Sequence, residues 1–353
     1  MLEIGIDSFV ARMADPATGA TLSATDRMAT LMDEVELADS VGLDVFGIGE
    51  HHRRDFLDAS PAVILAAAAM RTKRIRLTSA VSVLGASDPV RLFQDFATVD
   101  LLSKGRAEIV VGRGSFAEAY PLFGYDLKDY DVLFAEKLDL LLQLRDQTHV
   151  SWSGRFRATL NGQGVFPRPH QPRIPIWLGV GGTAQSFARA GRLGLPLMVA
   201  VIGGDFRSFR SFVELYREAG RMAGHAEATL SVGLHAIGFV GETDTQAREA
   251  FYPGWFSMFA SVGRERGWSP PTREQFEAMC APQGAFLLGS PDTVRNKVLA
   301  AQAAFGGLAR VTFQMSSASH DTQAMRRSIE LLGEEVAPAL REASIPSKIS
   351  ERQ

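Results

Sequence analysis

The sequence predicts a closed (β/α)8 barrel, an α/β fold in which eight parallel strands are covered by helices. Two observations carry this prediction. Short segments rich in β-branched residues alternate with longer segments whose apolar residues recur at helical spacing, and no proline- or serine-rich linker interrupts the alternation. A chain of 353 residues is also long enough for one such barrel. We expect a single domain over residues 1–343 and a polar tail at 344–353.

The order of the expected elements follows the chain. Eight strands are expected, at residues 2–9, 45–48, 75–84, 107–111, 174–180, 197–202, 230–240 and 309–314. The first strand precedes a helix at 26–41, which Gly42 ends. Other helices are expected at 131–145, from Thr183 onward and at 206–223. Three more begin where a capping residue precedes proline, at Ser60-Pro61, Asp88-Pro89 and Ser290-Pro291.

Two segments do not fit a bare barrel and are expected as insertions at its C-terminal mouth. Residues 146–173 contain three spaced prolines, with Pro175 just beyond, and they predict a surface hairpin followed by an extended run. Residues 251–288 are rich in aromatic side chains. This second insertion is either a lid over the mouth or additional packing, including a subunit contact.

The composition excludes several classes of partner. The net charge of -3 gives no general attraction to polyanions, so no nucleic-acid partner is expected. The longest apolar run, at 63–70, is too short to cross a membrane, and the N-terminus lacks the features of a secretory signal. The single cysteine, Cys280, excludes an intrachain disulfide and a cysteine-rich metal site. We therefore expect a cytoplasmic protein.

The expected strand at 45–48 carries polar residues at its C-terminal end. Side chains at the tips of parallel strands converge on one crevice, so His51 and His52 are candidates for chemistry. Because adjacent strand residues point to opposite faces, only His51 is expected to face the cavity. Gly47 and Gly49 share its face and are predicted to leave room for a flat ligand. The alternative is a histidine that only hydrogen-bonds to the next loop.

Two later strand tips are suited to an anion. Arg113 stands between Gly112 and Gly114 after an apolar strand, and its guanidinium suits a phosphate or carboxylate. The alternative for Arg113 is a structural ion pair. Gly181 and Gly182 join the strand at 174–180 directly to a helix, whose free amides are aimed at an anion. The segment lacks a dinucleotide fingerprint and a P-loop lysine, which favours a single phosphate.

These stretches, taken in order, resemble the bacterial luciferase-like flavin monooxygenase family. The resemblance is carried by Glu50-His51-His52, by 79–84 leading into Asp88-Pro89-Val90-Arg91, by 100–106, by Val111-Gly112-Arg113-Gly114, by 176–183 and by Leu288-Gly289-Ser290-Pro291. It extends from residue 2 to about residue 340. Its most specific part is Leu-Ser-Lys-Gly-Arg followed by Gly-Arg-Gly.

The resemblance implies a TIM barrel that binds FMN at its C-terminal mouth and forms a homodimer. By position, His51 matches the family's active-site histidine and Arg113 the arginine that holds the flavin phosphate. The phosphate-binding turn falls on Gly181, Gly182 and Thr183, with Ser186 in the first turn of the next helix. The peptide bond between Ala80 and Val81 lies where the family often has a cis bond beneath the flavin ring.

Two departures separate this chain from bacterial luciferase itself. Gly181-Gly182 replaces a Glu-Ser pair, so phosphate binding should depend more on backbone amides and Thr183. Gly112 replaces the luciferase cysteine beside the flavin. Light emission is therefore not implied.

The activity implied by the resemblance is that of a flavin-dependent monooxygenase, which uses reduced FMN and molecular oxygen to oxidise a small organic substrate. A separate flavin reductase is expected to supply reduced FMN, because no nicotinamide fingerprint is visible. The alternatives are a deazaflavin-dependent hydride-transfer oxidoreductase and a non-catalytic flavin-binding protein. A metal-dependent hydrolase is a further rival, but besides His51 only Asp7, His235 and His320 are placed for metal binding, and no His-x-His spacing occurs. We expect no metal.

Overall fold

The computed structural model describes residues 1–12, 14, 18–318 and 320–343, so the tail expected at 344–353 lies outside the described residues. Eight parallel strands close into a barrel in the order β1-β2-β3-β5-β8-β9-β10-β12, and β12 pairs with β1. They are β1 (Glu3–Ser8), β2 (Val45–Ile48), β3 (Arg76–Ser79), β5 (Ala107–Gly112), β8 (Ile176–Val180), β9 (Leu197–Val201), β10 (Val232–Val240) and β12 (Arg310–Gln314). The predicted TIM-like α/β barrel is therefore confirmed, whereas the single-domain boundary stays a prediction.

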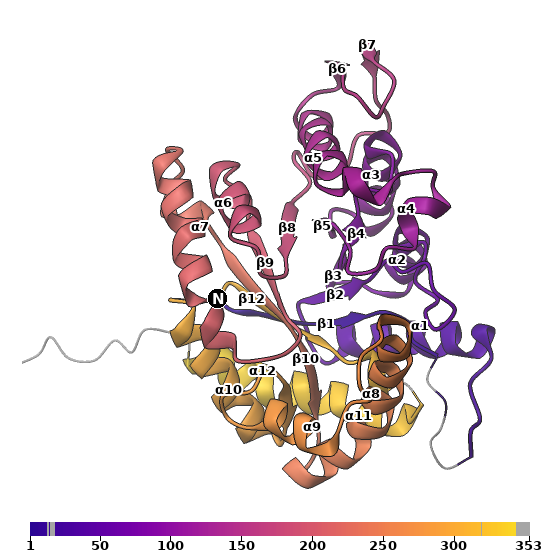
Figure 1. Cartoon of the computed structure of the whole chain (residues 1–353), viewed down its shortest axis with the longest axis vertical. Helices are drawn as coiled ribbons and strands as arrows, with labels where there is room; N and C mark the ends of the chain where they lie inside the picture. Colours follow the sequence, from indigo (N-terminus) through magenta and orange to yellow (C-terminus); the bar gives the residue numbers. More distant parts are fainter. Residues whose placement is uncertain (13, 15–17, 319, 344–353) are drawn as a thin grey trace, which may run out of the picture.

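Helices surround this barrel (Figure 1). They are α1 (Ala24–Ser40), α2 (Pro61–Arg71), α3 (Pro89–Ser103), α4 (Ala119–Leu122), α5 (Tyr130–Asp146), α6 (Ala184–Arg192), α7 (Arg210–Met222), α8 (Asp244–Arg266), α9 (Arg273–Cys280), α10 (Pro291–Ala304), α11 (Thr322–Leu331) and α12 (Ala337–Ala343). Of the three predicted caps, Asp88 accepts two backbone N–H groups of the following turn and Ser290 accepts one, whereas the Ser60 side chain accepts none. In the described part of the chain, no helix is long and apolar enough to span a membrane.

The remaining strands are additions to the eight-stranded barrel. The strand predicted at 75–84 is interrupted: β3 ends at Ser79, the peptide bond between Ala80 and Val81 is cis, and a short strand β4 (Ser82–Val83) then pairs with β5. The predicted surface hairpin is confirmed as β6 (His149–Trp152) and β7 (Leu160–Gly164), which extends from the body of the molecule in Figure 1. A short strand, β11 (Leu287–Gly289), pairs with β10.

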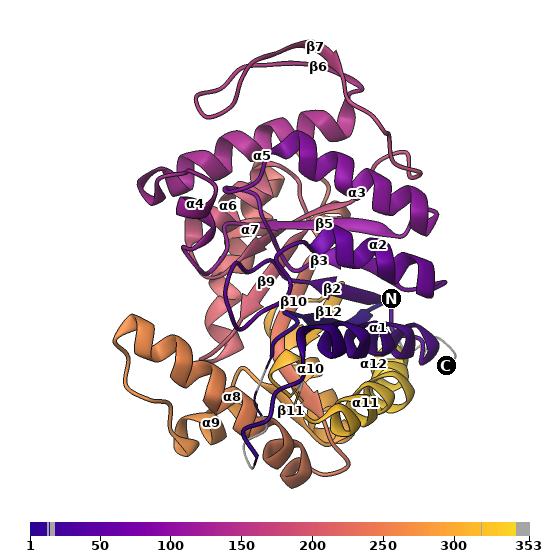
Figure 2. The same ribbon diagram turned by 90° about the vertical axis from the view of Figure 1, so that its right-hand side faces the viewer.

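The aromatic-rich segment at 251–288 is mostly helical. Its first part continues α8, and α9 and β11 follow. Figure 2 shows α4, α8 and α9 at the end of the barrel opposite the N-terminus. Trp255, Phe276 and Phe286 pack against one another, with ring centroids 5.1 to 6.1 Å apart. This part of the segment therefore provides packing, one of the two roles expected for it.

An ion-pair network lies inside the barrel, below the mouth. Arg310 is 1% exposed and donates from Nη1 to Glu108 Oε2 at 2.6 Å and from Nε to Glu3 Oε2 at 2.8 Å. Glu108 is equally buried and also pairs with Arg76. The Arg310 guanidinium lies 4.4 Å from the ring centroid of Trp177. Buried charges need such partners, because desolvation makes an unpaired one costly.

Two lysines are buried under the outer helices. Lys137 of α5 donates to the Gly85 carbonyl at 2.7 Å and lies 3.7 Å from the ring centroid of Tyr125. Lys297 of α10 donates to the Ala281 carbonyl at 2.7 Å, just after α9 ends. Burial lowers the pKa of both ammonium groups to about 8.

Because the pKa values of these two lysines are lowered, we expect the free energy of unfolding to rise between pH 8 and pH 9. Over that range the folded chain loses protons from Lys137 and Lys297 that the unfolded chain retains, so stability increases with pH. The expected gain is about 1 kcal/mol for each lysine. Above pH 10 the trend reverses, because burial raises the pKa of Tyr120 and Tyr216 well above the usual tyrosine value and that of Cys280 to about 12.

Urea unfolding at pH 8 and pH 9 measures this gain. The variant that carries both Lys137→Met and Lys297→Met is expected to lose it. An equal rise in the wild-type chain and in the double variant would contradict the assignment.

Candidate active site

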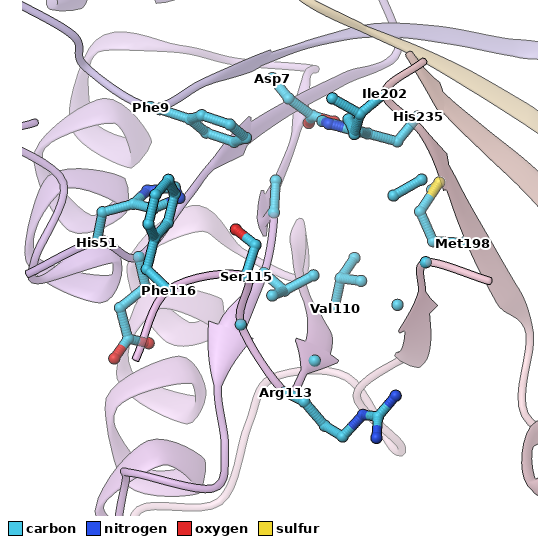
Figure 3. A pocket seen from close by; sticks show the side chains of 18 of the residues that line it. Asp7, Phe9, His51, Val110, Arg113, Ser115, Phe116, Met198, Ile202 and His235 are labelled. Atoms are coloured by element: carbon cyan, nitrogen blue, oxygen red, sulfur yellow. The ribbon is translucent and has the colours of Figure 1, made fainter. Parts of the chain in front are cut away.

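A cavity of about 560 Å³ opens at the C-terminal mouth of the barrel (Figure 3). Strand tips and the loops after them form its walls, and Met258, Phe259 and Val262 of α8 contribute from one side. Most of its walls are apolar. The polar side chains lie in a few groups, which include His51, Arg113 and His235. An enclosed apolar space with few polar groups is the usual form of a small-molecule site.

The structure places the sequence-predicted site residues around this one cavity. Those that line it are His51, Ala80, Val81, Arg113, Gly181, Gly182 and Thr183. Ser186 lies behind them in the first turn of α6, where its hydroxyl is 2.8 Å from that of Thr183. Asp7 and His235 also line the cavity, whereas His320 does not.

His51 is held by a buried carboxylate in the loop before α2. The Nδ1 atom of His51 is 2.7 Å from Asp58 Oδ2, and the backbone N–H of His51 donates to Asp58 Oδ1 at 3.1 Å. Burial raises the pKa of Asp58, although the bonds from His51 act in the opposite direction. The ring of His51 packs between Phe9 and Phe56, with centroids 4.6 and 4.7 Å away. Its Nε2 atom has no hydrogen-bond partner within the described residues.

The two adjacent histidines separate as strand alternation predicts. His51 lines the cavity and His52 does not. The Nε2 atom of His52 lies 3.2 Å from Glu50 Oε1, and its ring packs edge-on against Phe123. Glu50 Oε2 accepts the backbone N–H of Val83 at 2.8 Å. His52 therefore helps to hold Glu50, which in turn fixes the backbone after the cis peptide bond.

The prediction that Gly47 and Gly49 leave room for a flat ligand is wrong. A Cβ atom at Gly47 would overlap the Asp7 carboxylate, and one at Gly49 would lie 2.6 Å from the Phe9 ring and 2.7 Å from Asp58 Oδ2. Side chains of the protein already fill the space expected for a flat ligand. Each glycine instead makes room for a carboxylate that holds a cavity histidine: Asp58 for His51 and Asp7 for His235.

Glycines on the opposite wall make room for the Val81 side chain or leave the backbone open to the cavity. A Cβ atom at Gly112 or Gly179 would lie 2.6 or 2.7 Å from the side chain of Val81. By contrast, nothing lies within 4 Å of a Cβ atom placed at Gly181. The turn before α6 is therefore open toward the cavity. Gly182 has a φ of +127°, a backbone conformation that favours glycine.

Three polar side chains converge at this turn. The Arg113 Nη2 atom donates to Thr183 Oγ1 and to Ser186 Oγ, both at 3.3 Å. Its Nη1 atom donates to Asp131 Oδ1 at 2.5 Å, and the guanidinium lies 5.1 Å from the ring centroid of Tyr130. The ion pair left open by the sequence is thus present. Asp131 is largely exposed, so it can release Arg113 to an anionic ligand at modest cost.

The C-terminal end of α8 closes one side of the cavity. Arg266 donates to the Ser115 carbonyl at 2.9 Å and lies 5.1 Å from the ring centroid of Phe116. Arg53 donates to Glu265 Oε2 at 2.7 Å and also pairs with Glu118. These contacts tie α8 to the loops after β2 and β5. The segment expected as either a lid or packing therefore does both.

Sequence reasoning missed Asp58, Phe9 and Phe116. Asp58 lies seven residues after His51 in a loop without periodic structure, so no pattern indicates that its carboxylate folds back. Asp7, His235 and His320 are the further residues that the sequence places as possible metal ligands. Across the described ranges, no three histidine, cysteine or acidic side chains are grouped so that they could hold a metal ion.

Comparisons with known proteins agree with this geometry. A family model described as luciferase-like monooxygenase matches residues 8–307. The chain is 27% identical over 333 residues to 4-hydroxyprotoasukamycin monooxygenase of Streptomyces nodosus subsp. asukaensis, which covers 88% of this chain and 86% of that protein. Two uncharacterised proteins of Sinorhizobium fredii, y4vJ and y4wF, are 30% and 32% identical over 48% and 40% of this chain. The chain spans only 49% and 42% of their lengths.

Solved structures share the fold over nearly the whole chain. Monooxygenase RslO1 from Streptomyces bottropensis has a TM-score of 0.82 at 23% identity, covering 96% of this chain and 99% of that one. The oxygenating constituent of 3,6-diketocamphane monooxygenase from Pseudomonas putida, in complex with FMN, has a TM-score of 0.76 at 21% identity, with 96% and 98% covered. A coenzyme F420 dependent tetrahydromethanopterin reductase from Methanopyrus kandleri has a TM-score of 0.72 at 18% identity, with 96% and 99% covered. Because the family model matches most of the sequence, the chain belongs to the luciferase-like monooxygenase family of oxidoreductases.

Proposed function

We propose that the chain is a monooxygenase that binds reduced FMN and uses molecular oxygen to oxidise a small organic substrate. The observation that carries the proposal is the convergence of Arg113, Thr183 and Ser186 at the open turn before α6, beside an apolar cavity that His51 lines. The guanidinium, two hydroxyls and free amides of a helix N-terminus match a phosphate monoester. The same cavity extends across Ala80 and Val81 to the histidines.

The residues present fit a bound flavin mononucleotide. Arg113 and Thr183 would bind the phosphate, and Val81 and Val110 would support a flat ring within the cavity. When bound, the flavin supplies the electrons with which oxygen is activated. His51 would donate or accept a proton at Nε2, while Asp58 holds its Nδ1 atom. Phe116, together with the end of α8, would exclude water.

Cofactor binding and oxygen consumption test this proposal. Purified protein is titrated with FMN and, separately, with coenzyme F420, and then mixed with photoreduced FMN while dissolved oxygen is recorded. We expect saturable FMN binding, and oxygen incorporation into a screened panel of cyclic ketones and phenols. Binding of F420 alone would favour deazaflavin-dependent hydride transfer. FMN binding without any substrate oxidation would favour a non-catalytic flavin protein, and a separate reductase would then have no role.

Changes at the phosphate turn should alter FMN affinity in opposite directions. Arg113→Ala is expected to raise the dissociation constant of FMN by about 10- to 100-fold, because it removes a charge-assisted bond to the phosphate. Asp131→Asn is expected to lower the dissociation constant by up to about fivefold, because it frees Arg113 and removes a nearby negative charge. Fluorescence titration measures both. Equal affinity in Arg113→Ala and the wild-type chain would contradict phosphate binding at this turn.

We also propose that the chain forms a homodimer through the outer face of α2 and α3. The exposed side chains of α2 include Val63 and Met70, 72% and 70% exposed, with Ala67 between them. The neighbouring α3 exposes Leu101 and Leu102. An apolar stripe on a helix of a soluble enzyme is typical of a protein interface.

Light scattering after size exclusion measures the oligomeric state. Val63→Lys combined with Met70→Lys is expected to give monomers, because two charges would be buried at the interface. Met222→Lys on α7, where Met222 is 80% exposed, is the matched control and should leave the dimer intact. A dimer that survives the double change would place the interface elsewhere.

A further inference from the structure

A second His–Asp pair lies in the same cavity as His51. The Nδ1 atom of His235, on β10, is 2.6 Å from Asp7 Oδ2, on β1. Thr312, on the intervening strand β12, donates its hydroxyl to the same carboxylate oxygen. All three side chains are buried and line the cavity. Figure 3 shows Asp7 and His235 together, with Phe9 on the side toward His51.

The hydrogen bonds determine where the proton of His235 resides. Asp7 Oδ2 can only accept, so Nδ1 of His235 carries the hydrogen that it shares with this oxygen. In the neutral ring, Nε2 is then an acceptor, and it has no partner within the described ranges of the chain. Asp7 Oδ1 is also buried without a partner there. The unpaired Nε2 acceptor in an apolar space favours a ligand that brings a hydrogen-bond donor, whereas Asp7 Oδ1 faces Gly47.

The His51 pair differs in this respect. Asp58 uses one oxygen for the backbone N–H of His51 and the other for its Nδ1 atom, so the carboxylate is fully occupied in holding the ring. Among the described residues, Asp7 accepts hydrogen bonds through one oxygen only. Both pairs leave the Nε2 atom of their histidine without a partner among the described residues, and they differ in that the Asp7 carboxylate keeps one oxygen without a hydrogen bond.

We propose that the Asp7–His235 pair binds the acidic hydroxyl of a phenolic or enolic substrate and takes its proton. The O–H bond breaks, the proton moves to Nε2 of His235, and the substrate oxygen keeps the electron pair. The resulting imidazolium lies between the substrate oxyanion and the Asp7 carboxylate, so the total charge of the site does not change. The cationic side chains among the described residues of the cavity wall are Arg113, Arg266 and Arg310, and each already has its own protein partner.

A phenolic or enolic substrate also suits the rest of the cavity wall. The oxidation of that substrate rests on the proposed function. Met198, Ala200 and Val110 give apolar surfaces for a flat ring near His235. Ionising a phenol or enol makes its carbon skeleton more electron-rich, which favours electrophilic transfer of oxygen to that carbon. The pair therefore prepares the substrate, while His51 acts elsewhere in the cavity.

Binding of 4-nitrophenol to the flavin-free protein tests the proposal directly, because its phenolate form absorbs visible light and its neutral form does not. At a pH where the probe is neutral in water, the wild-type chain is expected to bind it as the phenolate. His235→Asn places an amide nitrogen near the position of Nδ1, which retains the bond to Asp7 and removes Nε2. This variant is expected to abolish the phenolate absorbance and to weaken binding about tenfold or more.

His52→Asn is the matched control, since it makes the same substitution at a histidine that does not line the cavity and should leave the phenolate absorbance unchanged. Asp7→Asn is the second variant if His235→Asn does not fold, and it should also lower the absorbance because the imidazolium loses its counter-charge. A neutral probe on the wild-type chain, or an unchanged phenolate signal in both Asp7→Asn and His235→Asn, would overturn the proposal.

FMN titration of the same variants separates this inference from the proposed function. It also tests whether the hydrogen-bond donor that His235 binds is the ring N–H of a flavin instead of a substrate hydroxyl. His235→Asn is expected to bind FMN as the wild-type chain does. A tenfold loss of FMN affinity with an unchanged nitrophenol signal would assign the pair to the cofactor and overturn the assignment to substrate. Absence of FMN binding in the wild-type chain would remove the proposed function, and the ionisation of the probe would still be measured.

Discussion

Replacing Glu108 by glutamine is expected to lower the free energy of unfolding by about 3–5 kcal/mol. The change leaves Arg310, which is 1% exposed, with the carboxylate of Glu3 alone and also removes the partner of Arg76. An uncompensated charge at that depth costs far more than the lost bond, because water cannot reach it. Denaturant unfolding at pH 7 measures the difference.

Glu3→Gln is the matched control for this experiment. Glu3 binds the same guanidinium at 2.6 Å, but its side chain is 32% exposed. Water can replace part of that interaction, so we expect a loss below about 1 kcal/mol. Equal losses for Glu3→Gln and Glu108→Gln would show that burial does not govern the energetics of this network.

Replacing His51 by asparagine is expected to lower turnover by about 100-fold or more, the usual contribution of a positioned acid or base. The FMN dissociation constant should change little, because the phosphate turn at Arg113 and Thr183 is untouched. The measurements are the rate of substrate oxidation at saturating reduced FMN and a separate FMN titration. A parallel loss of FMN affinity would assign His51 to binding rather than to proton transfer.

His52→Asn provides a control of the same size and charge one residue away. His52 does not line the cavity and bonds only to Glu50 among the described residues. We expect turnover within about threefold of the wild-type value, a shift of less than 1 kcal/mol in the activation free energy. Loss of activity equal to that of His51→Asn would mean that the two histidines act as one unit.

The sequence predicts the barrel well because each strand of a parallel sheet carries its own local signal. A run such as 197–202 is apolar on both faces, and caps such as Asp88 and Ser290 fix where helices start. The strand predicted at 75–84 contains only such local signals as well, and the cis bond at Ala80–Val81 interrupts it. The periodicity of apolar residues carries no signal for a cis peptide bond. Only the resemblance to the luciferase-like family indicated it.

The site is less accessible to sequence reasoning because its key contacts join residues far apart in the chain. Arg113 and Ser186 meet across 73 positions, and His235 meets Asp7 across 228. A strand tip indicates that a residue reaches the mouth, but not which neighbour it contacts there. Asp58 shows the same limit at short range, since its loop has no periodic structure to place its carboxylate.

The glycines at 47 and 49 have a consequence for how this sequence can change over time. A side chain at residue 47 would collide with the acid at residue 7, and one at residue 49 with both the ring at residue 9 and the acid at residue 58. A relative that loses either glycine must therefore also shorten or remove the matching acid. We expect residues 7 and 47, and likewise 49 and 58, to be exchanged as pairs, so that a relative lacking one pair has also given up the histidine that this pair holds.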